Sequence, residues 1–310
     1  MSFEKVVLVT RPTRLQESVR RYNTKAQAKF YVEKRGQSFS DYELEEETYQ
    51  RARDFVLKAI PSELKVQVID RSFLTNYLFT PHDMVVCLGQ DGLVVNAAKY
   101  LSGQPVVAIN PDPARFDGVL LPFQPEQTEG ALRAVASGHY TARKITMARV
   151  DLNDGQHLYA FNDLFIGPRS HITARYTLHI KGQAERQMSS GILVSTPAGT
   201  TGWMSSLFNQ TRGIATFAGL KNDVHAMRLN WEEKKLVFLV REPFASKWST
   251  VNMVAGTIVP GLAFSVESHM GESGVIFSDG METDFLEFNT GTTATVSIAE
   301  KSTDLVVKIA

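Results

Sequence analysis

Strand-like segments that alternate with helical stretches in the first 110 residues constrain the fold more than any other feature of the sequence. Residues 5–10 and 84–88 are continuous apolar runs, as expected of strands that are buried on both faces. Residues 64–69 alternate like a strand, and residues 105–109 have the composition of a further strand. Because helical stretches separate them, these segments predict a parallel sheet in an α/β domain.

Long charged stretches between the strands supply the helices. One helix is expected over residues 14–35, where Gly36 ends it, and a second over residues 40–60. A third is expected over residues 93–101, directly after the second apolar run. The run Glu45-Glu46-Glu47 in the second helix indicates a solvated helix face.

The character of the sequence changes near residue 142. From there on, short runs alternate in the manner of strands, and Thr, Ser, Gly and Asn separate them. Examples are residues 158–161, 174–180, 236–240 and 263–266, and a helix is expected only around 201–209. The sequence therefore predicts an α/β domain over residues 1–142 and a mostly antiparallel, β-rich domain over residues 143–310.

The composition excludes several functional classes. The 310 residues include 33 basic and 33 acidic ones, so the chain has no basic excess with which to meet nucleic-acid phosphates. Neither Cys87, the single cysteine, nor the seven histidines show the spacing of a metal site. No apolar stretch approaches the roughly 20 residues that span a bilayer, and the N-terminus lacks a signal-peptide pattern. We therefore expect a cytoplasmic protein without nucleic-acid or membrane partners.

The first candidate site is the turn Gly89-Gln90-Asp91-Gly92, which joins a buried strand to a helix. Glycines let the backbone approach a phosphate, and the start of a helix offers free N–H groups and positive potential. Asp91 would repel phosphates, so its presence indicates that it accepts a proton from a hydroxyl or holds Mg²⁺. Taken alone, the segment is also compatible with a plain Asx turn.

Two further segments carry polar groups at strand ends. Residues 195–203 form the loop STPAGTTGW, whose hydroxyls and glycines suit ribose and phosphate oxygens. Asn162-Asp163 ends an apolar stretch, where an amide and a carboxylate can bind ribose hydroxyls or an adenine edge. Taken alone, the loop is equally typical of an ordinary polar turn, and the isolated pair is more typical of a turn or a strand-end cap.

In this order and at these spacings, the three segments resemble those of the NAD kinase family. The Gly89–Gly92 turn resembles the family's GGDG turn, Asn162-Asp163 its Asn-Glu pair, and residues 195–203 its STPTGSTAY loop. Residues 109–123 are similar to the corresponding segment of mitochondrial-type NAD kinases. Residues 239–244 and 275–280 resemble the family's REP and VSxDG stretches.

This resemblance implies a two-domain fold with a nucleotide cleft between the domains, and a reaction. A phosphoryl group would pass from ATP, or another donor, to the adenosine-ribose 2′-hydroxyl of NAD, giving NADP. It implies Mg²⁺ as a cofactor, a homo-oligomer, and Asp91 as the catalytic base. It implies binding roles for Gly89, Gln90, Gly92, Asn162, Asp163, Thr196, Gly199, Thr200 and Thr201, whereas the histidine spacing predicts no protein metal site.

Three residues depart from the family's pattern. Gln90 replaces the second glycine, Leu93 replaces a threonine, and Asp163 replaces a longer glutamate. Gln90 either has a negative φ and points its amide at the donor, or it blocks the donor pocket; the retained neighbours favour the first hypothesis. Two other functions stay open: a kinase for another hydroxylated metabolite, and a non-catalytic dinucleotide-binding or regulatory protein.

Overall fold

The computed structural model describes residues 3–221 and 223–309. The chain divides into two compact units, one of Met1–Arg143 with Thr303–Ala310, and one of Lys144–Ser302. The sequence did not predict that the last residues return to the first unit. They do so because the end of β16 (Thr293–Ile309) pairs with β4, where Asp304 lies beside Pro105.

The first unit contains the predicted parallel sheet. Its first four strands are β1 (Lys5–Thr10), β2 (Lys65–Asp70), β3 (Asp83–Leu88) and β4 (Pro105–Ile109). They lie in the order β2-β1-β3-β4, followed by the end of β16, and all neighbours are parallel. Every residue of β3 and β4 is buried, which confirms the prediction that these segments are strands buried on both faces.

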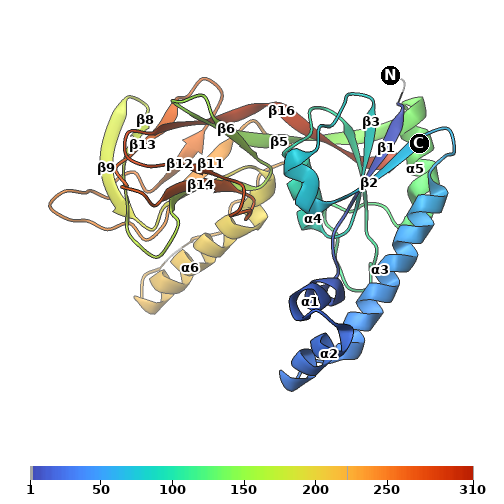
Figure 1. Ribbon diagram of the computed structural model, residues 1–310. Helices are drawn as coiled ribbons and strands as arrows, with labels where there is room; N and C mark the ends of the chain where they lie inside the picture. The colour runs from blue at the N-terminus through green and yellow to red at the C-terminus, as the bar shows by residue number, and fades with distance from the viewer. Residues whose placement is uncertain (1–2, 222, 310) are drawn as a thin grey trace. The chain divides into compact units, whose positions relative to one another are not determined.

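Helices cover both faces of this sheet (Figure 1). These are α3 (Phe39–Ala59), α4 (Asp91–Ala98) and α5 (Thr128–Ser137), whereas α1 (Arg14–Tyr22) and α2 (Lys25–Lys34) pack against the start of α3. Two 3₁₀ turns lie at Arg71–Asn76 and Pro125–Gln127. Residues such as Leu8 and Val107 of the sheet share one core with Tyr49 of α3 and Leu132 of α5. This core fixes where the loops at the strand ends lie.

The single helix predicted over residues 14–35 is wrong at its centre. Asn23 has a left-handed backbone conformation, with φ at 66°, and ends α1. Thr24 then caps α2 by accepting a hydrogen bond from the backbone N–H of Gln27 at 3.2 Å. Asn tolerates this conformation better than most residues, and threonine is a good N-cap, so the local chemistry favours two helices.

The second unit is a sandwich of antiparallel sheets. One sheet has the order β12-β11-β10-β7-β14-β15, and its strands are β12 (Ala255–Ile258), β11 (Leu236–Val240), β10 (Ile192–Ser195), β7 (Asp163–Pro168), β14 (Gly274–Ser278) and β15 (Phe285–Glu287). The other contains β5 (Tyr140–Leu152), β6 (His157–Ala160), β8 (Ala174–Ile180), β9 (Gln183–Ser189), β13 (Phe264–Ser268) and the start of β16.

Side chains from both sheets meet in one core, which includes Ile166, Tyr176, Phe238 and Phe264. The predicted helix near residues 201–209 is present and longer than expected: α6 spans Trp203–Phe217, after a 3₁₀ turn at Ala198–Thr201. Within the described ranges, no helix combines the length and the apolar character needed to cross a membrane.

Candidate functional site

The turn Gly89–Gly92 lies at the carboxyl end of β3, and α4 begins within it. Gln90 is the N-cap of α4, with φ at −95° and ψ at 167°, and Asp91 is the first helical residue. Gln90 is therefore not strained, because extended backbone suits any residue. The arrangement presents the free N–H groups of a helix start at the edge of the sheet where ligands bind.

The two glycines of this turn have different surroundings. A Cβ on Gly89 would lie 2.9 Å from Cδ2 of Leu93 and 3.4 Å from Cδ of Arg11. Gly89 is thus required by packing inside the protein, and Leu93 fills the space beneath the turn. Gly92 is exposed and has no atom within 4 Å of such a Cβ, so its bare backbone is open to a ligand.

Asp91 is held in a fixed orientation. Its Oδ1 accepts a hydrogen bond from the backbone N–H of Leu120 at 2.6 Å. Leu120 belongs to the loop that follows β4, so two loops at the same sheet edge share this contact. One carboxylate oxygen is engaged in this way, so the hydrogen bond fixes the direction in which the carboxylate points.

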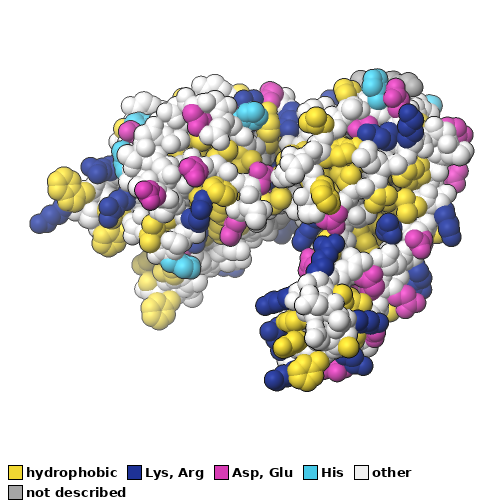
Figure 2. Space-filling model, in the orientation of Figure 1, with side chains coloured by type: hydrophobic (Ala, Val, Ile, Leu, Met, Phe, Trp, Pro, Cys, Tyr) yellow, Lys and Arg dark blue, Asp and Glu magenta, His cyan; other side chains and the backbone are white. Residues whose placement is uncertain are grey.

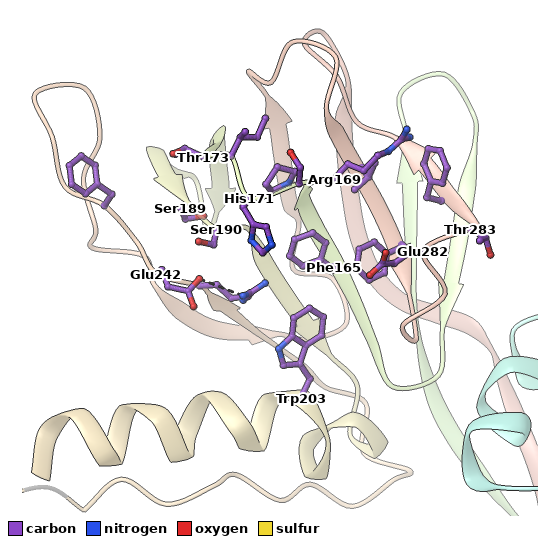
Figure 3. A pocket seen from close by; sticks show the side chains of 18 residues that line it. Phe165, Arg169, His171, Thr173, Ser189, Ser190, Trp203, Glu242, Glu282 and Thr283 are labelled. Atoms are coloured by element: carbon purple, nitrogen blue, oxygen red, sulfur yellow. Dashed lines mark ion pairs between the residues drawn. The ribbon is translucent and has the colours of Figure 1, made fainter. Parts of the chain in front are cut away.

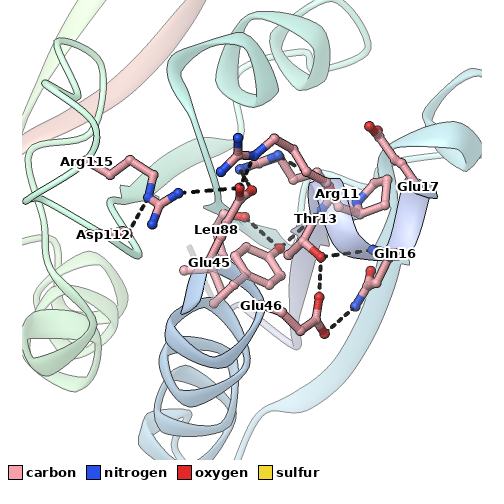
Figure 4. Close-up of polar contacts among 12 residues, drawn as sticks. Arg11, Thr13, Gln16, Glu17, Glu45, Glu46, Leu88, Asp112 and Arg115 are labelled. Atoms are coloured by element: carbon pink, nitrogen blue, oxygen red, sulfur yellow. Dashed lines mark hydrogen bonds and ion pairs between the residues drawn. The ribbon is translucent and has the colours of Figure 1, made fainter. Parts of the chain in front are cut away.

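Glu45 organises three arginines next to the turn (Figure 4). It is 4% exposed, and its oxygens contact Arg11 at 3.3 Å, Arg115 at 3.7 Å, and the Nε of Arg14. The prediction that residues 45–47 form a solvated face is therefore wrong for Glu45. It fails because the start of α3 faces the segment after β1, which carries Arg11 and Arg14, a contact that helical periodicity does not reveal.

The charge of this cluster is positive on balance. Burial opposes ionisation of Glu45, but the hydrogen bond from Arg14 and the charges of Arg14 and Arg11 outweigh it and hold the Glu45 pKa below its usual range. The Nε of Arg11 is buried and has no hydrogen-bond partner among the described residues. Arg115 also pairs with Asp112 at 3.2 Å. Guanidinium groups bind phosphate oxygens in a planar, often bidentate way, so the cluster suits a phosphate-bearing ligand.

In the second unit, the structure brings the two other predicted segments together. β7 and β10 pair antiparallel, with Asp163 opposite Ser195. The N–H of Thr196 donates to the carbonyl of Asn162 at 2.8 Å. A Cβ on Gly199 would lie 2.1 Å from that same carbonyl, so only glycine fits there. The pair and the loop therefore lie together at the strand ends, where Asn162 is partly exposed and Asp163 and most of the loop are buried.

The loop's hydroxyls have mainly internal partners. Thr196 donates its hydroxyl hydrogen to the carbonyl of Phe161 and accepts the N–H of Gly199 at 3.2 Å. The hydroxyl of Thr200 donates to the carbonyl of Pro197 at 2.7 Å. Thr196 and Thr200 are buried, whereas Thr201 is exposed. Within the described residues, Thr196 and Thr200 thus shape the loop, and Thr201 is the one whose side chain meets solvent.

Asp163 is a buried carboxylate that lacks a hydrogen-bond partner among the described residues. It is 7% exposed, and burial, together with the charge of Asp279, raises its pKa to about 7. Asp279 accepts the backbone N–H groups of Phe161, Asn162 and Asp163 at 3.0, 2.7 and 3.2 Å. The sequence did not assign a role to Asp279, although it lies in the segment that resembles VSxDG. A ligand with hydroxyl or amino hydrogens would satisfy Asp163.

A cavity of about 1050 Å³ in the second unit is lined by Phe165 and Trp203, but by none of the binding residues that the sequence predicted in this unit (Figure 3). The ring of Phe165, two residues beyond Asp163, stacks on that of Trp203, with 5.7 Å between the ring centroids. The Cζ of Arg241 lies 5.2 Å from the Trp203 ring centroid. Trp203 also packs against Leu193, so it serves both as packing and as a wall of the cavity. Flat aromatic walls with a nearby cation suit a nucleobase.

Comparisons with known proteins show what the chain is similar to. No protein-family model matches the chain. It is 28% identical to an NAD kinase of Cellvibrio japonicus over 182 residues, which are 57% of each chain. It is 28% identical to an NAD kinase of Saccharolobus solfataricus over 49% of this chain and 55% of the relative. It is 33% identical to an NAD kinase of Hahella chejuensis over 40% of this chain and 44% of the relative. The chain spans about half the length of the curated relatives it matches.

Solved structures extend the similarity to the whole fold. A yeast NADH kinase complexed with NADH superposes with a TM-score of 0.61 at 14% identity, covering 99% of this chain and 84% of that one. An Archaeoglobus fulgidus NAD kinase in complex with ATP superposes with a TM-score of 0.54 at 17% identity, covering 97% of this chain and 92% of that one. The fold is therefore that of the NAD kinases. Together with the sequence similarity, it supports an NAD kinase-like family for this chain, as the three segments predicted.

Replacing Glu45 by Gln should destabilise the protein, because three arginines lose their shared carboxylate. We expect a loss of about 1–3 kcal/mol in the free energy of unfolding at pH 7, measured by urea titration. The pKa of Glu45 is lower in the folded protein than in the unfolded chain. The carboxylate therefore stabilises the fold fully above the ordinary carboxyl pKa, and this stabilisation is lost as the pH falls through the lowered pKa of the folded state. The difference from wild type should therefore shrink below about pH 4.

Glu47→Gln is the matched control, since Glu47 is exposed on the same helix. It should change stability by less than about 0.5 kcal/mol. Equal effects of the two substitutions would contradict the role given to Glu45.

Proposed function

We propose that this protein transfers a phosphoryl group from ATP to the adenosine-ribose 2′-hydroxyl of NAD, giving NADP. The observation that carries the proposal is Asp91, an oriented carboxylate at the start of α4 in a turn suited to phosphates. A protein that only bound phosphates would gain nothing from a negative charge there. A general base for a hydroxyl, or a partner for Mg²⁺, gives that charge a purpose.

In the first unit, we assign the donor phosphates to the start of α4 and to Arg11 and Arg115, two of the arginines held by Glu45. The backbone at Gly89 and Gly92 would approach the phosphates, and Arg11 and Arg115 would offset their charge. Transition states of phosphoryl transfer carry charge on the equatorial oxygens, and fixed cations stabilise it. Gln90 would add amide hydrogen bonds to the same group.

In the second unit, we assign the adenosine half of NAD to Asn162 and Asp163. Asp163 would accept hydrogen bonds from ribose hydroxyls or the adenine amino group, which would supply its missing partners. The loop that contains Thr196, Gly199 and Thr200 would shape the surface, and Thr201 would contact the ligand directly. The relatives, which are NAD kinases, support this choice of acceptor.

Mg²⁺ is part of the proposal as the companion of the donor phosphates. Among the described residues, no group of three His, Cys, Asp or Glu side chains is placed to hold a metal ion. Mg²⁺ usually takes only one or two carboxylates in addition to substrate phosphates and water, so Asp91 alone fits this mode. When bound, the ion would neutralise charge on the phosphates.

We also propose a cytoplasmic homo-oligomer. An apolar surface at the end of α6 supports self-association: Ile214, Phe217 and Leu220 are 59%, 94% and 64% exposed. The cytoplasmic location rests on the sequence, whose single cysteine, Cys87, leaves no intramolecular disulfide framework.

An assay of the purified protein with ATP, Mg²⁺ and NAD tests the proposed reaction by the NADP it forms. Parallel reactions with NADH and with polyphosphate identify the preferred acceptor and donor. A second candidate, a dinucleotide-binding protein without catalysis, is favoured by one observation: Leu93 places a buried apolar side chain where the family has a hydroxyl. Binding of NAD without any NADP formation would support it.

Asp91→Asn should abolish turnover and leave the affinity for NAD within about tenfold of wild type. Asparagine can still accept the N–H of Leu120, so the turn should keep its shape, but it cannot take a proton. Asp117→Asn, an exposed change in the loop after β4, is the control and should leave kcat unchanged. If Asp91→Asn retains more than about a tenth of wild-type kcat, Asp91 is not the base.

The affinity for NAD should rise as pH increases from about 6 to 8. The Asp163 pKa is raised to about 7, and the proposed ligand hydrogen bonds need the carboxylate, so binding should release a proton. Asp163→Asn should flatten this pH dependence in calorimetric titrations. Asn162→Ala should weaken binding by about 1–3 kcal/mol yet keep the slope, since Asp163 remains. A flat wild-type profile would exclude Asp163 from the binding site.

Gln90→Gly distinguishes a contributing Gln90 from a blocking one. Because Gln90 has an unstrained backbone, we expect its amide to serve the donor. The glycine variant should then change the KM for ATP or the preference between ATP and polyphosphate, with unchanged NAD affinity. Steady-state kinetics of both proteins provide the measurement. If the wild type forms no NADP and the Gln90→Gly variant does, Gln90 blocks the donor.

A further inference from the structure

Another cavity, this one in the first unit, lies among α1, α2 and α3, and no function described so far uses it. Its volume is about 230 Å³. The residues that line it are Arg14, Glu17, Ser18, Arg21, Tyr22, Val32, Arg35, Gln37 and Tyr42. None of them belongs to the Gly89–Gly92 turn, and of the three arginines held by Glu45 this helical pocket shares Arg14 alone.

Positive charge dominates the helical pocket. Three arginines line it, against one carboxylate, that of Glu17, which pairs with Arg71 at 3.2 Å. Arg14 pairs with Glu45, but in the part of the chain that the structure describes, neither Arg21 nor Arg35 forms an ion pair with a carboxylate. Figure 2 shows Lys and Arg side chains gathered around this end of the first unit. Two cationic groups thus remain available to an anion.

Tyr22 adds an unsatisfied donor at the same place. Its hydroxyl is buried and has no hydrogen-bond partner among the described residues, while its ring stacks on Tyr31 at 4.4 Å. By contrast, Tyr42 on the other wall donates its hydroxyl to Gln37 at 2.9 Å. Buried polar groups in folded proteins are nearly always hydrogen-bonded, so the Tyr22 hydroxyl indicates a missing acceptor.

The break between α1 and α2 creates this arrangement. The left-handed Asn23 turns the chain back, so that Arg21, in the last turn of α1, and Arg35, the C-cap of α2, line one cavity. Basic residues at helix ends also stabilise the helix dipole. Arg20 and Lys34 occupy the same last turns without lining the cavity, so the dipole alone does not account for the pocket.

We propose that the helical pocket binds the phosphoryl or pyrophosphoryl group of a small metabolite through Arg14, Arg21, Arg35 and the Tyr22 hydroxyl. Such groups offer several acceptor oxygens and multiple negative charges, which match the guanidinium groups and the unpartnered donor. The volume lies below the roughly 300 Å³ typical of drug-sized ligand sites, so the bound part of the ligand is small. This site is additional to the proposed donor and acceptor sites, and it does not depend on the proposed reaction.

Calorimetric titration with pyrophosphate tests the proposal with two matched double variants. Arg21→Gln/Arg35→Gln removes two charges from the pocket, and Arg20→Gln/Lys34→Gln removes two charges from the same helices outside it. The pocket variant should lose pyrophosphate affinity by at least about tenfold, whereas the control should stay within about twofold, since exposed charges outside the site are screened. Both variants keep the Gly89–Gly92 turn, so binding at the turn cancels in the comparison.

Tyr22→Phe provides a second test that does not alter charge. The hydroxyl has no partner in the protein, so its removal should leave thermal unfolding unchanged and weaken pyrophosphate binding about three- to tenfold. Equal pyrophosphate affinities of the two double variants, or an unchanged affinity of Tyr22→Phe, would overturn the proposal. These measurements need no catalysis, so they remain decisive even where no NADP is formed.

Discussion

Parallel pairing of β1, β3 and β4 is the constraint on which the candidate phosphate site depends. Because the strands run the same way and are buried on both faces, the segments that follow them emerge at one edge of the sheet. Arg11 follows β1, the Gly89 turn follows β3, and Arg115 follows β4. The buried carboxylate of Glu45, supplied by α3, then holds the arginines in place, so packing and electrostatics act on the same edge.

In the second unit, antiparallel pairing brings polar residues from two strand ends together. The pairing of β7 with β10 sets Asn162 and Asp163 against the loop that begins at Thr196. Asp279 satisfies the backbone N–H groups around them, and its charge, added to burial, disfavours ionisation of Asp163. A carboxylate kept without partners at this surface has a free-energy cost, and a ligand with hydrogen-bond donors would remove it.

Local chemistry explains which parts of the fold were predictable. The apolar runs and the Gly89–Gly92 turn were recognised because strand burial and helix starts leave direct patterns in neighbouring residues. The break at Asn23 had a local cause, yet a charged stretch without proline concealed it. The burial of Glu45 had no local signal at all, since its partners come from other elements. The roles assigned to the site residues remain predictions.

The sequence by itself determined the alternation of strands and helices, the change to a β-rich half, and the order of the three polar segments. These follow from hydrophobic periodicity, glycine and hydroxyl content, which act over a few residues. Only the tertiary structure decided that Asp163 lies beside Asp279, that Glu45 holds three arginines, and that Arg21 and Arg35 line one cavity. Such contacts join residues far apart in the chain, and their energies depend on burial and distance, which no local pattern encodes.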